Sequence, residues 1–218
     1  MPQDTLFQYL KDIGDGSIAK ETPDCSVTPY KVPESTRRFT ELRDTRLIST
    51  TDFFYPLVDD PYMQGRIACC NVLSDLYAMG VPRVDHMLMI LGISLQMSEK
   101  ERHIVTKEMM RGFNDCASEA DTVITGGQSI MNPWPMIGGV ANVTLQKNEY
   151  VRPNHGEVGD LVVLTKPLGT QPAVNMYQKK QEDPSWNPPE LTESQISNAY
   201  HLAMESMATL NKNTSGLL

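Results

Sequence analysis

The sequence lacks the features of several large protein classes. No apolar run approaches the ~20 residues of a membrane span, and the N-terminal MPQDTLFQYL has no basic region followed by an apolar one, as a secretory signal would. Lys and Arg number 19 against 27 Asp and Glu, a formal net charge of −8, which argues against a nucleic-acid surface. We therefore expect a cytoplasmic protein that binds neither membranes nor nucleic acid.

Motifs for zinc sites, nucleophilic catalysis and common phosphate loops are also missing. The four cysteines, Cys25, Cys69, Cys70 and Cys116, contain no Cys-x-x-Cys pair, so we interpret them as reduced, mostly buried thiols. The histidines form no His-x-x-x-His or Ser-His-Asp pattern, and neither Gly-x-Gly-x-x-Gly nor Gly-Lys-Ser/Thr occurs.

The 218 residues suit one large domain or two small ones, and the patterns divide them near residue 155. In residues 1–155 we expect a loop-rich beginning, with a short helix at 4–11 and a mobile loop at 12–45. The regular elements expected next are a strand at 47–51 and a helix at 61–79, which Asp60 caps and Gly80 ends. A strand at 84–93 and a helix opened by the capping box Ser98–Glu101 follow. Two more strands are expected at 122–125 and 134–145, the second broken by Gly138-Gly139.

Residues 156–218 predict only one strand, at 161–165, and two helices. The first helix follows Gly169, and the second follows a capping box from Thr192 to Gln195. One strand cannot close a sheet with its own core, so we expect an incomplete second domain.

Asp75 is the strongest candidate functional residue that the pattern alone provides. It lies within an almost wholly apolar helix, where a carboxylate is costly unless it is paired or bound to a cation. Asn71 and Ser74 share its face. These oxygens suit Mg²⁺, but a satisfied buried hydrogen-bond network explains them equally well.

Two further candidates are ambiguous by themselves. Asp52 ends a strand, where functional groups are common, but a turn-forming Asp explains it as well. Gly126, Gly127 and Gln128 follow a strand and could present N–H groups to a phosphate, or form an ordinary turn.

Read together, several strings resemble the selenophosphate synthetase (selenide, water dikinase) family, and most of all its eukaryotic branch. The resemblance extends over roughly residues 46–218. The strings are TTDFFYP at 50–56, VDDPY at 58–62, GRIA at 65–68, NVLSDLYAMG at 71–80, TGGQ at 125–128, NPW at 132–134 and GDLVVLTKPLGT at 159–170.

The resemblance implies an aminoimidazole-ribonucleotide-synthase-like α+β fold. Its N-terminal domain has a mixed sheet with helices and dimerises into a shared β-barrel, and its C-terminal α/β domain is truncated here. The implied reaction converts ATP, selenide and water to selenophosphate, AMP and phosphate, with Mg²⁺ and commonly K⁺. Such a transfer from ATP depends on cations more than on a covalent nucleophile.

The resemblance also assigns site residues. It makes Asp24 and Asp75 metal ligands that hold Mg²⁺ against ATP, and it places Asp52 near the nucleotide. The ATP-contacting loop then contains Gly126, Gly127, Gln128 and Ser129. The family's redox Cys or selenocysteine and its Lys correspond to positions upstream of Met1, so no catalytic residue is expected here.

Two alternatives remain open. A chain that lacks these segments is expected to be an inactive fragment of the enzyme, or a dimerising, nucleotide-binding module or paralogue without catalysis. A kinase of the same superfamily that acts on thiamine phosphate is the other alternative, which the TTDFFYP and DDPY strings disfavour.

Overall fold

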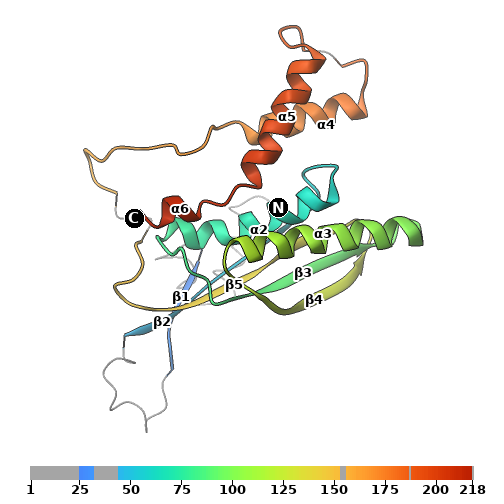
Figure 1. Cartoon of the computed structure of the whole chain (residues 1–218). Helices are drawn as coiled ribbons and strands as arrows, with labels where there is room; N and C mark the ends of the chain where they lie inside the picture. The colour runs from blue at the N-terminus through green and yellow to red at the C-terminus, as the bar shows by residue number, and fades with distance from the viewer. Residues whose placement is uncertain (1–24, 32–43, 153–155, 187, 218) are drawn as a thin grey trace, which may run out of the picture.

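A five-stranded mixed sheet organises the first part of the chain (Figure 1). The computed structural model describes residues 25–31, 44–152, 156–186 and 188–217. The strands follow the order β1-β2-β5-β3-β4; β3 and β4 are parallel and all other pairs are antiparallel. The elements are β1 (Ser26–Pro29), β2 (Thr45–Phe54), α2 (Pro61–Ala78), β3 (His86–Ser94), α3 (Glu99–Glu119), β4 (Ile124–Asn132) and β5 (Met136–Gln146).

The helices α2 and α3 cover one face of this sheet, and the core lies between them and the strands (Figure 1). Alternate residues of β3, including Met87 and Leu91, are buried against the helices. Phe113 of α3 and Leu73 of α2 are fully buried opposite them. Among the described residues no helix covers the other face, so the mixed α+β architecture expected from the sequence is confirmed, with one face open.

The predicted helix boundaries agree with the structure because the capping residues act as expected. Asp60 accepts hydrogen bonds from the backbone N–H groups of Tyr62, at 2.8 Å, and Met63, at 3.1 Å. Gly80 takes the left-handed conformation, with φ of 70°, directly after α2. Both capping boxes also form, at the start of α3 and at the start of α5.

The helices α2 and α3 touch backbone to backbone. A Cβ atom added at Gly65 would lie 2.0 Å from the carbonyl oxygen of Met109, and one added at Gly112 would lie 1.9 Å from that of Tyr62. Beside this contact, Tyr62 donates to Asp115 at 3.0 Å and Arg66 pairs with Glu119 at 2.6 Å. Only glycine allows helices to approach so closely.

The helices of the second part of the chain pack along α2, the first two near its start and the last near its end (Figure 1). These helices are α4 (Thr170–Glu182), α5 (Glu193–Met207) and the short α6 (Lys212–Ser215). The rings of Tyr177 and Tyr200 stack at 3.8 Å with an interplanar angle of 6°. The Tyr200 hydroxyl accepts from the backbone N–H of Asp59 at 2.9 Å, which ties α5 to the loop before α2.

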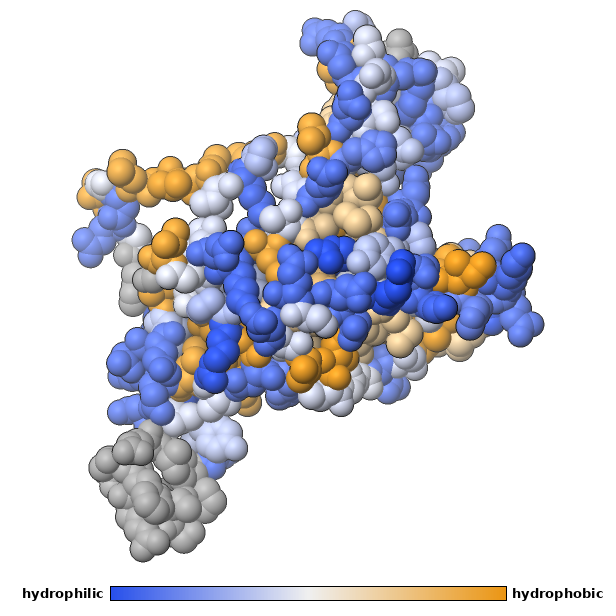
Figure 2. Space-filling model, in the orientation of Figure 1, coloured by the Kyte–Doolittle hydropathy of each residue, from blue (hydrophilic) through white to orange (hydrophobic). Residues whose placement is uncertain are grey.

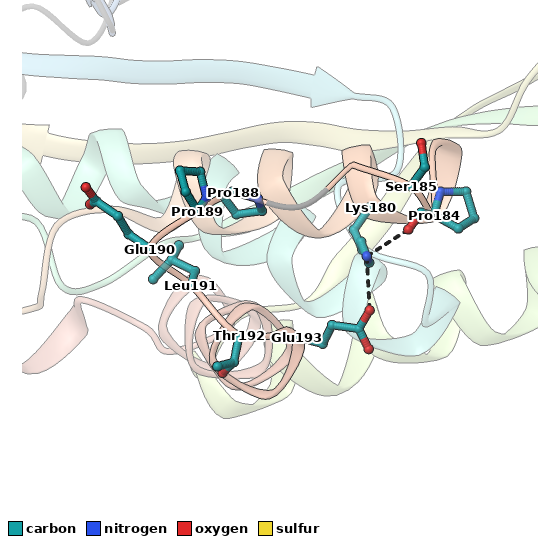
Figure 3. Close-up of a pocket in the computed structure, with 9 residues that line it drawn as sticks. All are labelled: Lys180, Pro184, Ser185, Pro188, Pro189, Glu190, Leu191, Thr192 and Glu193. Carbon is teal, nitrogen blue, oxygen red and sulfur yellow. Dashed lines mark hydrogen bonds and ion pairs between the residues drawn. The ribbon is translucent and has the colours of Figure 1, made fainter.

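The connection between α4 and α5 is organised around one lysine (Figure 3). The Lys180 ammonium donates to the carbonyl oxygens of Pro184, at 2.8 Å, and Trp186, at 3.1 Å, and pairs with Glu193 at 3.0 Å. A cavity of about 650 Å³ lies beside it, and its lining includes Pro184, Pro188 and Pro189. Since all three ammonium protons have acceptors, Lys180 has a structural role.

The expected strand at 161–165 is wrong. Residues 156–168 form an extended arm instead, which leaves the body of the molecule and carries Val158 and Leu161 to Leu164 into solvent (Figures 1 and 2). Leu161 is 90% exposed and Val162 is 91% exposed. In the described parts of the chain no neighbouring strand supplies hydrogen-bond partners to this segment, so its β-forming sequence stays unpaired.

Three smaller expectations also need correction. β1 lies in the segment 12–45 that was expected to be loop, because pairing with β2 overrides its weak local pattern. Gly126, Gly127 and Gln128 lie inside β4 and form no turn. Gly138 and Gly139 do not interrupt β5. They allow the close approach of β2 and β3, since a Cβ at Gly138 would lie 2.1 Å from the Asp52 carbonyl oxygen and one at Gly139 would lie 2.4 Å from that of Leu88.

The expected helix at 4–11 and most of the segment 12–45 fall outside the described residues.

No helix in the described ranges is long and apolar enough to cross a membrane.

We predict that Gly65→Ala lowers the free energy of unfolding by about 1–3 kcal/mol, because the added methyl group forces α2 away from the Met109 carbonyl. Denaturant unfolding followed by circular dichroism measures the change. Gly156→Ala is the matched control, because a Cβ at Gly156 meets nothing within 4 Å. Equal midpoints for the two variants would contradict the steric role of Gly65.

Candidate functional site

The polar face of α2 borders a cleft that the second part of the chain closes. Asn71 and Ser74 line a cavity of about 250 Å³ together with Lys166, Thr170 and Asn211. An adjoining hollow of about 350 Å³ shares Ser74, Lys166 and Asn211 with it. Asn71 and Ser74 therefore do face a common polar space, but Asp75, expected on the same helix face, is not among the residues that line either cavity. The structure adds groups from residues 166–170 and from the segment before α6.

Asp75 is half-buried between α2 and the sheet, and its carboxylate is directed toward β2. Its carboxylate accepts a hydrogen bond of 2.6 Å from the Thr50 hydroxyl. Thr50 is 3% exposed on the helix-facing side of β2. The bond fixes one carboxylate oxygen and orients the side chain, which is what both a metal ligand and a structural network require.

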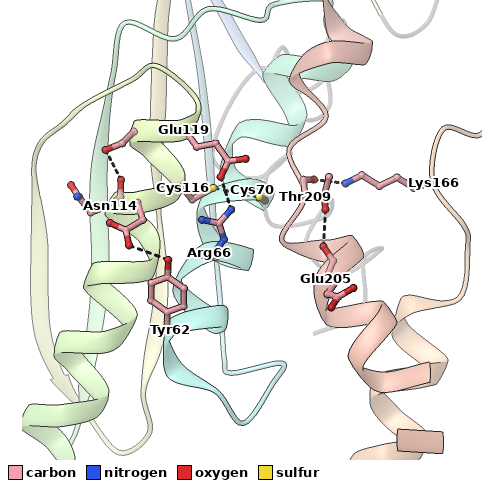
Figure 4. A network of polar contacts seen from close by, with 11 residues as sticks. Tyr62, Arg66, Cys70, Asn114, Cys116, Glu119, Lys166, Glu205 and Thr209 are labelled. Atoms are coloured by element: carbon pink, nitrogen blue, oxygen red, sulfur yellow. Dashed lines mark hydrogen bonds and ion pairs between the residues drawn. The ribbon is translucent and has the colours of Figure 1, made fainter. Parts of the chain in front are cut away.

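Lys166 is the cationic group of the cleft. Its ammonium donates to the backbone carbonyls of Ser206, at 3.0 Å, and Thr209, at the C-terminal end of α5 (Figure 4). Burial lowers the pKa of Lys166, while the helix carbonyls stabilise the positive charge. The residue pattern gave no reason to single out Lys166; the only signal was its place in the string GDLVVLTKPLGT.

The structure does not bring all the predicted site residues together. Asp52 is half-buried on β2, on the same side of the strand as Thr50. Gly126 to Ser129 lie on β4, three strand positions away from β2, or roughly 14 Å at the usual strand spacing. Gly127 has φ of 150° and a Cβ there would lie 1.9 Å from the Met89 carbonyl oxygen, so its close packing against β3 explains the glycine.

The oxygen donors near Asp75 suit a hard divalent cation. The Asp75 carboxylate and the Asn71 and Ser74 side chains are ligand types that Mg²⁺ accepts, usually together with water and phosphate oxygens. Within the described residues no group of three or more His, Cys, Asp or Glu side chains could hold a metal. Asp24, the second expected ligand, lies outside the described residues.

Comparison with known proteins places these motifs in a family. The chain is 55% identical over 174 residues to "Selenide, water dikinase 2" of Mus musculus, covering 79% of this chain and 38% of that protein. It is 43% identical over 218 residues to "Selenide, water dikinase" of Dictyostelium discoideum, covering 97% of this chain and 55% of that protein. The chain thus spans about two fifths to just over half the length of these relatives.

Solved structures share the fold at low sequence identity. The structure of "AaThiL complexed with AMPPCP and TMP" superimposes with a TM-score of 0.63 at 16% identity, covering 92% of this chain and 62% of that one. Residues 35–143 match the family model described as "AIR synthase related protein, N-terminal domain". The family model matches half of the chain, and the alignment with the dikinase of Dictyostelium discoideum extends beyond that match at both ends. The chain belongs to the AIR synthase related family.

Proposed function

We propose that this chain provides the ATP- and Mg²⁺-binding part of a selenide, water dikinase, which forms selenophosphate from ATP, selenide and water and releases AMP and phosphate. The identity of 55% to a protein of that name carries the proposal. The surroundings of Asp75 support it, because Thr50 orients its carboxylate and its helix neighbours Asn71 and Ser74 line a polar cleft.

In this proposal the chain's own residues bind and orient the reactants. Asp75 holds Mg²⁺ with Asp24, and Asp52 lies near the nucleotide. Mg²⁺ bound there, and K⁺ where it is used, would supply positive charge against the charge that develops on the transferring phosphoryl group. Lys166 adds positive charge to the same cleft. The solved ThiL structure contains an ATP analogue, which is consistent with a nucleotide-binding fold.

We also propose that two copies of the chain form a homodimer through the open face of the sheet. That face carries Phe53, 52% exposed, with Leu88 and Ile90 of β3 beside Val140 of β5. An apolar sheet face without a covering layer is a typical interface. Because Gly126 to Ser129 and Asp75 lie far apart within one chain, a shared nucleotide site would draw on both copies.

We predict that Asp75→Asn reduces selenophosphate formation about 100-fold or more, since it removes one charge that holds Mg²⁺ while the amide oxygen can still accept from Thr50. Phosphorus NMR of the protein that carries this sequence, supplied with ATP, Mg²⁺ and selenide, measures the product. Asp85→Asn is the control, because Asp85 also accepts one hydrogen bond, from the Thr144 backbone at 2.8 Å. Unchanged activity in Asp75→Asn would remove the role assigned to Asp75.

The same assay separates the alternatives. Thiamine phosphate in place of selenide is expected to yield no product, and product with thiamine phosphate alone would favour the other kinase. Nucleotide binding and dimer formation without any turnover would favour the non-catalytic module.

We predict that Phe53→Arg converts the dimer to a monomer, because it places a charge on the open apolar face. Light scattering coupled to size-exclusion chromatography gives the mass. Ile104→Arg is the matched control, since Ile104 is similarly exposed, at 48%, but belongs to α3 on the opposite face of the sheet. A dimer that persists in Phe53→Arg but not in Ile104→Arg would place the interface on α3.

A further inference from the structure

Two cysteines from different helices meet in the core directly behind the cleft. The sulfur atoms of Cys70 on α2 and Cys116 on α3 lie 3.4 Å apart (Figure 4). Cys69 points elsewhere in the core, with its sulfur 4.0 Å from that of Met87. None of the four cysteines forms a disulfide in the structure, and all four are buried, as the sequence predicts.

The packing of the helices holds this pair in place. Cys70 lies five residues after Gly65, and Cys116 lies four residues after Gly112, so both follow the backbone contact by about one turn. A disulfide needs sulfur atoms about 2.05 Å apart, so the pair must close by roughly 1.4 Å. Because the helix backbones already touch at Gly65 and Gly112, we expect rotation of the two side chains about χ1 to close most of that distance.

The two thiols differ in access. Cys70 is 6% exposed and lines the cleft beside Lys166, whereas Cys116 is fully buried behind it. A small molecule in the cleft can therefore reach the sulfur of Cys70 first.

We propose that Cys70 and Cys116 form a reversible disulfide whose oxidant is a small hydroperoxide that enters through the cleft. The Cys70 sulfur attacks one peroxide oxygen, the O–O bond breaks, and the thiol proton leaves in the released water or alcohol. The Cys116 sulfur then attacks the sulfenic acid of Cys70, forms the S–S bond, and releases a second water. Two thiols are oxidised and one peroxide is reduced.

The disulfide would link α2 to α3 one residue before Asn71, and so at the polar face that borders the cleft. The site is independent of the proposed dikinase activity, because it requires only the folded chain and a hydroperoxide.

Peptide mass spectrometry after treatment of the purified chain with hydrogen peroxide tests the proposal. Under non-reducing conditions we expect one linked peptide pair that joins Cys70 to Cys116, and its complete loss after addition of dithiothreitol. Cys70→Ser should abolish the link, whereas Cys69→Ser and Cys25→Ser, the matched controls, should retain it. Because the wild-type chain gives the primary result, the test does not depend on the folding of any variant.

Three results would overturn the proposal. A link from Cys116 to Cys69 would assign the chemistry to the other thiol of α2. Oxidation of Cys70 to sulfinic acid without a link would show that Cys116 cannot reach it. Thiols that stay fully alkylatable after excess peroxide would show that the cleft does not admit the oxidant.

Discussion

The contact between Gly65 and Gly112 is the constraint on which most of the structure depends. It brings the backbones of α2 and α3 together, and the side-chain contacts Tyr62–Asp115 and Arg66–Glu119 fit only at that separation. The same contact fixes the rotation of α2 about its own axis. That rotation turns the apolar residues toward the sheet and leaves Asn71 and Ser74 facing the cleft.

Two lysines then attach the second part of the chain to this core. Lys166 donates to carbonyls at the end of α5, and Lys212 donates to the Ala120 carbonyl at the end of α3, at 3.0 Å. Each lysine places its positive charge beside the unpaired carbonyl groups at the C-terminal end of a helix, which carry a partial negative charge. Because Lys166 is also a wall of the cleft, the shape of the candidate site depends on the same interaction that anchors α5.

Local signals in the sequence were sufficient for the helices and for the polar face of α2. Asp60, Gly80 and the two capping boxes act within a few residues of themselves, so their patterns predict the helix ends without knowledge of the fold. Asp75 could be singled out because a charge in an apolar helix is unusual. Its partner Thr50 is 25 residues away and gave no signal, since only tertiary packing brings the two together.

The errors arose where distant parts of the chain decide the conformation. The glycines at 126–127 were expected to form a turn, but they lie within β4, and Gly127 is explained by the close approach of the Met89 backbone. The short β1 forms through pairing with β2. The segment 161–165 has a strong strand sequence and forms no strand, because strand propensity has no effect without a neighbouring backbone.

That extended arm has a consequence for how the chain behaves in concentrated solution. Val158, Leu161, Val162 and Leu168 are each at least 80% exposed, and β4 forms a free edge of the described sheet. An extended apolar segment without a hydrogen-bonding neighbour and a sheet edge without a neighbour are complementary surfaces on the same molecule. Pairing of this arm with the β4 edge of another copy would therefore link copies of the chain in spite of the net charge of −8 that each carries.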